Sequence, residues 1–391
     1  MGRKTAAASP RGAADLRDAL VALNAAPEVG RAPACHLGLA ALRHCTLSAR
    51  ADGFGLPGPL AAAARRVVAR AAVRAEAERE RAHRAGARVV TLLEADYPRP
   101  LLDLALPPPV LYVQGEVPPE VAAGAGAVAI VGSRAADAYG REAADHFARA
   151  LAGAGLCVVS GCARGVDAVA HRGALAAGGT TVAVLGCGID VDYPRGHAGL
   201  RRDIAAAGAV ITEFPCGCTP EAWHFPVRNR LIAALALGTL VVQAGERSGS
   251  LITARHALDL GREVLAVPGS VFAARAAGPH ALLRDGAVPA ATPRDVLDAL
   301  LGPSRAAALE LPGAPGSPGG ARPGGVRGAV LEALEVGEPR SPEALAAALG
   351  EGIDAVLGAL LELELEGWAR RHPGPGYSRA GRRAGPPTCP G

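Results

Sequence analysis

Small polar residues and arginines gather in short loops whose spacing suits the binding of phosphate. Gly132, Ser133 and Arg134 follow an apolar run and precede a helical one. At such a point a hydroxyl, a guanidinium and the free N–H groups of a helix can converge on an anion. Two further loops, Ser160–Gly165 and Ser248–Thr253, also combine glycine with hydroxyl side chains. The pattern predicts a cradle for phosphate groups.

The segment Phe225–Arg230 adds an aromatic ring and two arginines, in the order Phe-Pro-Val-Arg-Asn-Arg. We expect it to open a helix. A base stacked on the ring, with Arg228 and Arg230 on the flanking phosphates, is what binding of single-stranded nucleic acid requires. In the alternative interpretation, one of these arginines pairs with Glu213 beneath the sheet edge.

Asp167 and His171 lie one helical turn apart after the Ser160 loop. They either contribute to the site or form a capping and packing pair that fixes the loop. The loop Gly186–Asp190 lacks the third glycine of a dinucleotide fingerprint, so no nicotinamide cofactor is expected.

Motifs of nucleophilic catalysis, nucleotide hydrolysis and metal binding are missing from the sequence. Neither Ser133 nor Ser160 lies in a Gly-x-Ser-x-Gly elbow, no Gly-Lys-Ser/Thr motif occurs, and no Cys/His cluster has metal-ligand spacing. We therefore expect a binding protein with no enzymatic activity, no cofactor and no metal.

The elements that position these loops alternate regularly. Apolar runs typical of buried strands are separated by helical stretches, which predicts a doubly wound parallel sheet with its loops at the carboxyl ends of the strands. The expected strands are Ala127–Val131, Leu156–Ser160, Thr181–Leu185, Ala209–Thr212, Thr239–Gln243 and Glu263–Val267. The expected helices are Tyr139–Ala154, Gly165–Ala177, Gly196–Ala207, Arg228–Leu237 and Ser250–Leu260.

Composition divides the chain into five parts. Residues 1–86 read as a poorly defined, partly flexible helical region, 87–301 as the α/β domain, 302–325 as a Pro/Gly-rich linker, 326–380 as a winged helix and 381–391 as a flexible tail. The expected recognition helix carries Glu362, Glu364 and Glu366, which a duplex groove repels, so this module should pack against protein or gate the site. We expect the glutamates of the helix near residues 60–85, Glu76, Glu78 and Glu80, to lie on a solvated surface.

The overall composition is that of a folded protein. Half of the 391 residues are hydrophobic, the net charge is +4, and Lys4 is the only lysine among 41 basic residues. No apolar run reaches the length of about 18 residues that a membrane span needs, and the N-terminus has no secretory core. The eight cysteines follow no disulfide pattern. We expect a cytoplasmic protein with reduced thiols and no membrane insertion.

At these loops the sequence resembles the DprA/Smf family, the DNA-processing proteins A. The shared blocks include Gly-Ser-Arg with Tyr139-Gly140, Ser-Gly-Cys-Ala-Arg-Gly with Ala170-His171, and Gly-Ser-Leu-Ile-Thr-Ala-Arg, and they stand in the family's order. They are Tyr97–Leu102, Pro107–Gly115, Val128–Arg134, Val159–Asp167, Ala183–Asp190 with Tyr193-Pro194, Phe225–Arg230, Ser248–Arg255 and Gly261–Gly269.

The resemblance implies an extended Rossmann-like domain that binds single-stranded DNA, protects it and hands it to the RecA recombinase during natural transformation, without catalysis. It implies that the pocket is lined by Gly132, Ser133, Arg134, Ser160, Gly161, Phe225, Arg228, Asn229 and Arg230. From the same loops we add as single-stranded DNA contacts Arg164, His171, Gly188, Tyr193, Ser248, Gly249, Ser250 and Thr253.

The resemblance also implies a homodimer, with its interface near Val271–Ala287. This chain departs from the family at Gln243, where a glutamate is usual, and in the alanine-rich loop Val271–Pro279. The rival interpretation is an enzyme related to nucleotide-monophosphate phosphoribohydrolases, whose motif Pro-Gly-Gly-x-Gly-Thr-x-x-Glu is degraded here over Gly245–Thr253. A nucleoid or replication accessory protein without RecA contact would fit the same pocket.

Overall fold

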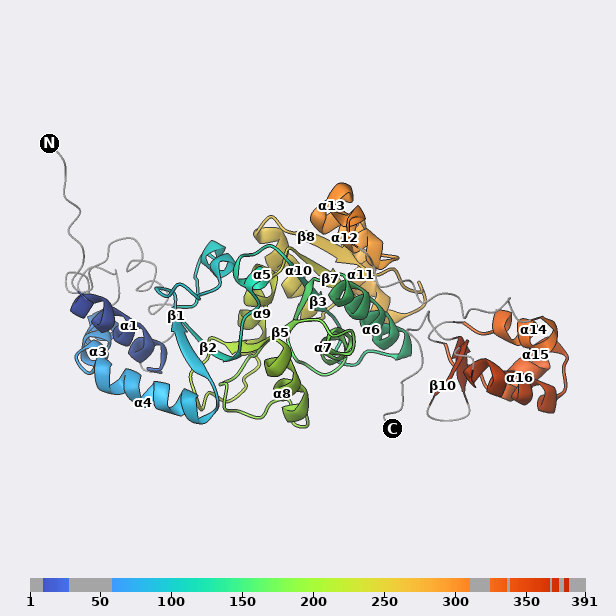
Figure 1. Ribbon diagram of the computed structural model, residues 1–391, viewed down its shortest axis with the longest axis horizontal. Coiled ribbons are helices and arrows are strands. Elements are labelled where there is room, and N and C mark those ends of the chain that lie inside the picture. The colour runs from blue at the N-terminus through green and yellow to red at the C-terminus, as the bar shows by residue number, and fades with distance from the viewer. Residues whose placement is uncertain are drawn as a thin grey trace.

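The computed structural model describes residues 10–27, 58–309, 324–335, 338–365, 368–372 and 376–379. Its centre is a nine-stranded sheet in the order β1-β2-β6-β5-β4-β3-β7-β8-β9. Figure 1 shows this sheet with helices packed around it. The strands are β1 (Arg88–Thr91), β2 (Val110–Gly115), β3 (Ala127–Val131), β4 (Cys157–Ser160), β5 (Thr181–Val184), β6 (Ala209–Thr212), β7 (Gly238–Val241), β8 (Glu263–Ala266) and β9 (Val288–Pro289).

The strands from β6 to β9 run parallel, which confirms the predicted doubly wound sheet. Each of the six predicted strands occurs within two residues of its expected bounds. β1 and β2 extend the sheet by antiparallel pairing next to β6. Because β3 lies between β4 and β7, the chain reverses its direction of travel across the sheet there, and ligand sites in such sheets lie at the carboxyl ends near this point.

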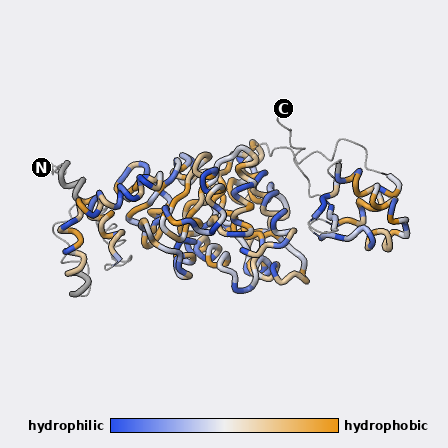
Figure 2. The backbone as a smooth tube through the Cα atoms, turned by 90° about the horizontal axis from the view of Figure 1, so that it is seen from below, coloured by the Kyte–Doolittle hydropathy of each residue, from blue (hydrophilic) through white to orange (hydrophobic). Residues whose placement is uncertain are grey.

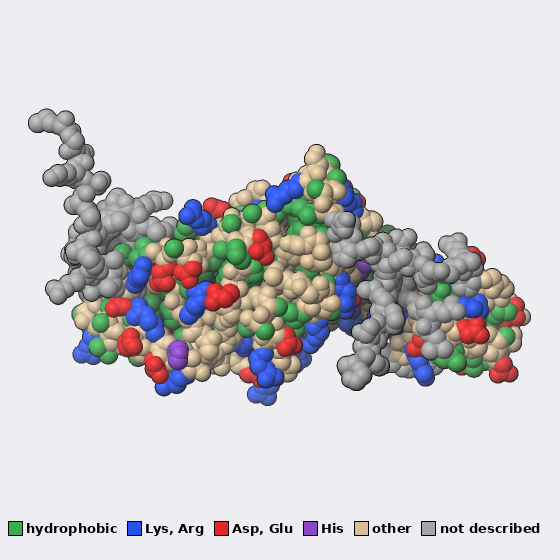
Figure 3. Space-filling model, in the orientation of Figure 1, with side chains coloured by type: hydrophobic (Ala, Val, Ile, Leu, Met, Phe, Trp, Pro, Cys, Tyr) green, Lys and Arg blue, Asp and Glu red, His purple; other side chains and the backbone are tan. Residues whose placement is uncertain are grey.

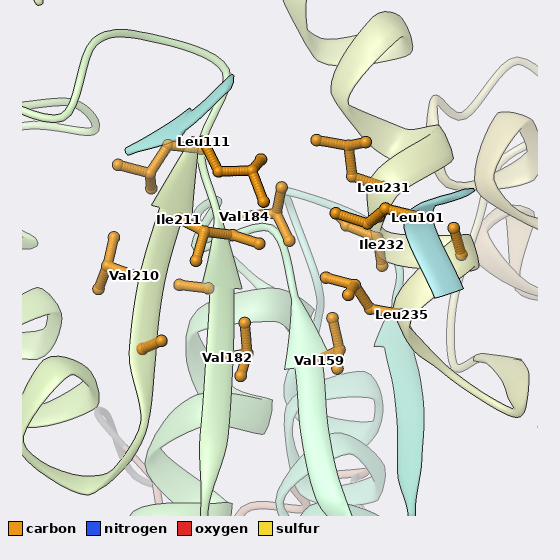
Figure 4. Close-up of a cluster of buried hydrophobic side chains, with 14 of the residues drawn as sticks. Leu101, Leu111, Val159, Val182, Val184, Val210, Ile211, Leu231, Ile232 and Leu235 are labelled. Carbon is orange, nitrogen blue, oxygen red and sulfur yellow. The ribbon is translucent and has the colours of Figure 1, made fainter. Parts of the chain in front are cut away.

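Helices cover both faces of the sheet. α6 (Ala138–Gly153) and α7 (Val166–Ala176) pack on one face with α12 (Pro293–Leu301), and α8 (Ala198–Ala207) lies beside α7. α9 (His224–Leu235) and α10 (Ser250–Asp259) pack against each other on the opposite face. Figure 4 shows one part of this core, where α9 and the 3-10 turn η1 (Arg99–Asp103) pack on the strands through Leu101, Leu111, Val159, Val182, Val184, Val210, Ile211, Leu231, Ile232 and Leu235.

The remaining short elements of this domain lie near the edges of the sheet. They are α5 (Pro119–Ala122), η2 (Ala274–Ala276), α11 (Ala277–Arg284) and α13 (Pro303–Ala307). α13 falls inside the predicted linker, and its Ala306 is buried against the α12 side of the core. The folded part of the chain therefore continues past residue 301, because α13 buries an apolar side chain against the domain. The rest of the predicted linker from residue 310 to 323 lies outside the described residues.

The described N-terminal helices are α1 (Pro10–Asn24), α3 (Gly58–Val68) and α4 (Ala71–Arg84). α1 and α4 pack beside the edge of the sheet at β1 and β2, and α3 packs on α1 and α4. The expectation that Glu78 lies on a solvated surface is wrong, because its side chain is buried and accepts a hydrogen bond of 2.8 Å from the backbone N–H of Cys216. Asn24 of α1 likewise donates to the carbonyl of Glu213 at 3.1 Å. The helical region therefore supports the loop that follows β6.

The C-terminal part is a winged helix with its own apolar core around Val330, Leu345, Leu360 and Tyr377. It contains α14 (Gly325–Ala333), α15 (Pro342–Leu349), α16 (Ile353–Leu365), β10 (Ala369–Arg371) and β11 (Tyr377–Arg379). In Figure 2 its hydrophobic segments form a group separate from those of the central domain. Glu366 and the predicted tail 381–391 lie outside the described residues.

Within the described part of the chain, no single helix is long and apolar enough to cross a membrane. The helices Pro342–Leu349 and Ile353–Glu364 reach that length and apolar composition only when taken together, and a bend of 116° separates them.

Candidate nucleic-acid interface

Three of the predicted residues form a stack at the carboxyl end of the sheet. The guanidinium carbon of Arg134 lies 4.7 Å from the centre of the Phe225 ring, and the Phe225 and Tyr193 rings lie 5.5 Å apart with 38° between their planes. Arg134 follows β3, Phe225 lies in the first turn of α9, and Tyr193 lies between β5 and α8. Arg134 is exposed and both rings are partly exposed. The stack offers an aromatic surface and a cation side by side.

Gly186 explains how the Phe225 ring reaches this position. A Cβ atom at residue 186 would lie 2.9 Å from Cδ1 and 3.1 Å from Cε1 of Phe225. The ring therefore occupies the space that any other residue after β5 would fill. This glycine serves side-chain packing within the site, whereas the glycines of dinucleotide-binding loops admit a ligand.

The loop that carries Tyr193 is held from two sides. Arg201 of α8 donates to the carbonyls of Val191 at 2.6 Å and Ile189 at 2.5 Å. Asp190 accepts from the backbone N–H of Gly217 at 2.8 Å and 3.0 Å. Sequence reasoning missed Arg201, because an arginine inside a helix carries no local signal that it turns inward.

Arg228 occupies a different position from the one expected. α9 begins at His224, four residues before the predicted start, so Arg228 falls in the interior of the helix and is only 3% exposed. Its guanidinium donates to the carbonyl of Gly161 at 2.7 Å and to that of Val184. Burial lowers the pKa of Arg228, and the nearby Asp167 carboxylate opposes that shift. In this structure Arg228 joins the ends of β4 and β5 and is not presented to a ligand.

Arg230 also has internal partners. It forms an ion pair with the buried Glu213 and donates to the carbonyl of Leu106 at 2.8 Å. The alternative interpretation, pairing with Glu213, is therefore confirmed for Arg230. Between them, Asn229 donates to the carbonyl of Gly249 at 3.0 Å and ties α9 to the loop before α10.

The interior also encloses His171 and Ser160. His171 has 0% exposure, its Nδ1 lies 2.7 Å from the Thr181 hydroxyl oxygen, and burial lowers the pKa of its imidazole to about 3. Ser160, also at 0%, donates to the carbonyl of Ile130 at 2.6 Å. The packing interpretation of His171 fits these contacts, and neither side chain reaches the surface that a DNA strand could contact.

Two helix N-termini carry a carboxylate of the chain itself, and at α6 this carboxylate accepts one of the backbone N–H groups that were expected to bind an anion. Asp137 caps α6 by accepting from the backbone N–H of Gly140 at 2.9 Å. Asp167 lies in the first turn of α7 and accepts from Ala163 at 3.4 Å. These carboxylates already satisfy the positive end of the helix dipole.

Gln243 ties the loop after β7 to the loop after β3, where the chain reverses. Its side-chain amide donates to Asp137 at 2.8 Å, and its backbone carbonyl accepts from the backbone N–H of Ser133 at 2.7 Å. Among the predicted residues, Gly132 packs against Val166 and the Gln243 backbone, while Gly188 packs against the Pro215 carbonyl. These contacts hold the loops together.

Of the remaining predicted residues, some lie at the surface and others are buried. Arg164 and Gly249 are exposed and Ser248 is partly exposed, while Ser250 and Thr253 are buried at the start of α10. Figure 3 shows that acidic and basic side chains are intermixed over the visible face of the domain. The described residues contain no group of three or more His, Cys, Asp or Glu side chains that could hold a metal ion. The stack of Arg134, Phe225 and Tyr193 therefore marks the candidate site more clearly than charge does.

Comparisons with known proteins agree with this arrangement. The family model described as DNA recombination-mediator protein A matches residues 88–301, and the DprA winged helix domain matches residues 314–375. Protein Smf of Escherichia coli strain K12 is 40% identical over 298 residues, which cover 74% of this chain and 78% of the relative.

Solved structures match this chain as well. DNA processing protein A of Streptococcus pneumoniae superimposes with a TM-score of 0.61 at 30% identity, covering 76% of this chain and 97% of that one. DNA processing protein A of Helicobacter pylori, from a study of its single-stranded DNA binding mode, gives a TM-score of 0.50 at 29% identity, covering 56% and 97%. The central sheet, the loops at its carboxyl end and the winged helix thus have a shared origin, and the chain belongs to the DNA recombination-mediator protein A family, also called DprA or Smf.

Proposed function

We propose that this protein binds single-stranded DNA at the carboxyl end of its sheet and acts in DNA processing. The observation that carries the proposal is the contact of an exposed guanidinium with a partly exposed aromatic pair, Arg134 over Phe225 beside Tyr193. Bases of any sequence can stack on such rings, and the cation attracts the adjacent phosphate. The single-stranded DNA binding mode described for the Helicobacter pylori family member supports the same assignment.

The strand would follow the surface residues. Arg134 and Arg164 are exposed beside the ends of β3 and β4, so they are the phosphate contacts of this proposal. Phe225 and Tyr193 receive bases. Arg228 and Arg230 shape the loops through their contacts with backbone and Glu213. Binding of this kind needs no cofactor and no chemical step.

We also propose what happens to the bound strand. The bound strand is protected from nucleases and handed to RecA during natural transformation, in the cytoplasm. The protein would act as a homodimer through the face near residues 271–287. A groove of about 810 Å³ lies there, lined mainly by apolar side chains together with Glu246, His280 and Arg284, and Phe272 is 96% exposed. The neighbouring Val271 is 79% exposed, and adjoining exposed apolar side chains are typical of an interaction site.

The experiment is fluorescence anisotropy of labelled single-stranded and duplex oligonucleotides across a salt series. We expect tighter binding of the single strand by the full chain. Arg134→Ala should weaken it and reduce the slope of log affinity against log salt by about 0.7, because one phosphate contact is lost. Since the Arg134 side chain is exposed, the free energy of unfolding should stay unchanged.

Two results would contradict binding of single-stranded DNA at this site. If the wild-type chain binds no single-stranded oligonucleotide at low salt, or if Arg134→Ala binds with the same affinity and salt slope, the site holds something else. A screen of mononucleotides would then test the phosphoribohydrolase-like alternative. Binding of single strands without any effect on RecA filament assembly would instead favour an accessory protein without RecA contact.

A further inference from the structure

Trp223 is an exposed aromatic residue beside the site that no motif singled out. It directly precedes α9 and lies two residues before Phe225. Its exposure is 51%, which is high for so large an apolar side chain. The described residues that surround it form a second aromatic group, distinct from the stack of Arg134, Phe225 and Tyr193.

The indole is held in a fixed orientation. The rings of Trp223 and His224 lie 4.1 Å apart at 75°, and Phe214 lies 6.4 Å from Trp223 at 62°. Phe214 and His224 are themselves buried, at 1% and 2% exposure. The indole N–H donates to Glu221 at 2.5 Å. An exposed ring that is fixed from behind and at its edge loses little conformational entropy when a ligand stacks on it.

The location of the indole continues the row of the proposed site. Phe214 follows β6, the Phe225 ring packs on Gly186 after β5, and Arg134 follows β3. These strands lie in the order β6-β5-β4-β3, with neighbouring strands about 4.8 Å apart. An aromatic surface on the β6 side therefore stands next to the Phe225 position on the same edge of the sheet.

We propose that Trp223 is a further base-stacking position, which extends the path of single-stranded DNA from Phe225 toward the β6 side of the sheet. This inference rests on the proposed function, because it assumes that the strand lies on this edge. The indole N–H is hydrogen-bonded to the carboxylate of Glu221, and this negative charge repels phosphate. Trp223 therefore contributes through the base and not through the sugar-phosphate backbone.

Removal of the ring tests this division. Trp223→Ala should lower the affinity for an oligo(dT) strand about tenfold, within the range for loss of one stacked base. The slope of log affinity against log salt should be unchanged, since no phosphate contact is lost. Trp223→Phe should recover most of the affinity. Both variants should bind an oligonucleotide with abasic residues in place of the thymidines as well as the wild type does.

Fluorescence gives an independent readout that leaves the site intact. The chain has two tryptophans, and the second, Trp368, belongs to the winged helix. In a Trp368→Phe variant all indole emission comes from Trp223. Saturation with oligo(dT) should quench it, and the abasic strand should leave it nearly constant.

The outcomes separate the two proposals. If Trp223→Ala binds oligo(dT) like the wild type, or if the emission of Trp368→Phe does not change at saturation, the stacking role is refuted while the loss of binding in Arg134→Ala can still uphold the site. If the wild type binds no single strand, the proposed function fails and the inference with it. Trp223→Phe guards against a folding defect, because it keeps the aromatic contact with His224.

Discussion

Three arginines at this edge of the sheet differ in their contacts, although each belongs to a motif that was expected to bind phosphate. Arg134 is exposed over a ring, Arg228 is buried against backbone carbonyls, and Arg230 is paired with Glu213. The difference follows from where each residue lies: Arg134 is in a loop after a strand and reaches outward, whereas Arg228 is on the buried side of α9.

Arg228 should accordingly affect folding more than binding. Arg228→Ala removes a donor from the carbonyls of Gly161 and Val184, and it removes the main positive charge that offsets the burial of Asp167. We expect the free energy of unfolding to fall by about 3 kcal/mol. Urea denaturation measures it, and Arg228→Lys should show a smaller loss because it keeps the charge.

A contrary result would change the role assigned to this residue. Should Arg228→Ala keep its urea midpoint and lose affinity for single-stranded DNA, the guanidinium would have to leave its buried position and contact the strand. Substitution of both Arg228 and Arg230 would not separate these roles, since both side chains hold the structure together.

At the scale of elements, the site depends on how loops from different strands lock one another. Arg201 fixes the loop before α8, Asp190 joins it to the loop after β6, and Gly186 leaves room for the Phe225 ring. Asn24 and Glu78 anchor the loop after β6 from the N-terminal helices. The stacking surface is therefore preorganised by contacts that lie behind it.

The substitution Gly186→Ala tests this preorganisation. The added methyl group would displace the Phe225 ring, which lies within 2.9 Å of it, and separate it from Arg134. We expect affinity for single-stranded DNA to fall by up to about tenfold, as for loss of one stacked base, in the anisotropy assay. Gly199→Ala in α8 is the matched control, because its Cβ meets no atom within 4 Å and alanine favours the helix. Equal affinities for the two variants would contradict the packing role of Gly186.

At the scale of the whole molecule, the winged helix presents an apolar and acidic surface on one of its helices. Its α16 exposes Ile353, Leu357 and Leu361, at 39%, 44% and 56%. Glu362 on the same helix pairs with Arg327 of α14 at 3.2 Å. An apolar and acidic helix surface does not favour a DNA groove, although Arg370 and Arg371 on the wing are exposed.

Removal of this module should therefore leave duplex binding almost unchanged. A chain ending at residue 309 keeps the complete central sheet and α13. We expect its affinity for a duplex oligonucleotide to stay within about twofold of the full chain at moderate salt, because few phosphate contacts are removed. Anisotropy measures both chains in parallel. A large drop in duplex affinity on truncation would show that the wing or α16 contacts DNA.

Much of this arrangement was predictable from sequence. The six apolar runs each became a strand within two residues, and the loops after them lie at one edge of the sheet, because buried parallel strands need continuous apolar residues and crossover helices. Which of these loops are neighbours follows from the strand order, which was not predicted from the sequence. The family blocks along the chain were likewise visible without coordinates.

Only the tertiary structure decided which members of those loops face solvent. His171, Ser160 and Arg228 turn inward, Arg134, Phe225 and Tyr193 form a stack, and Glu78 is buried at a domain contact. The position of Trp223 at the same edge follows from the pairing of β6 with β5, which only the tertiary structure gives. Sequence determines the local preference of each residue for a strand, helix or loop, but exposure depends on atoms contributed by segments far along the chain, which no local pattern contains.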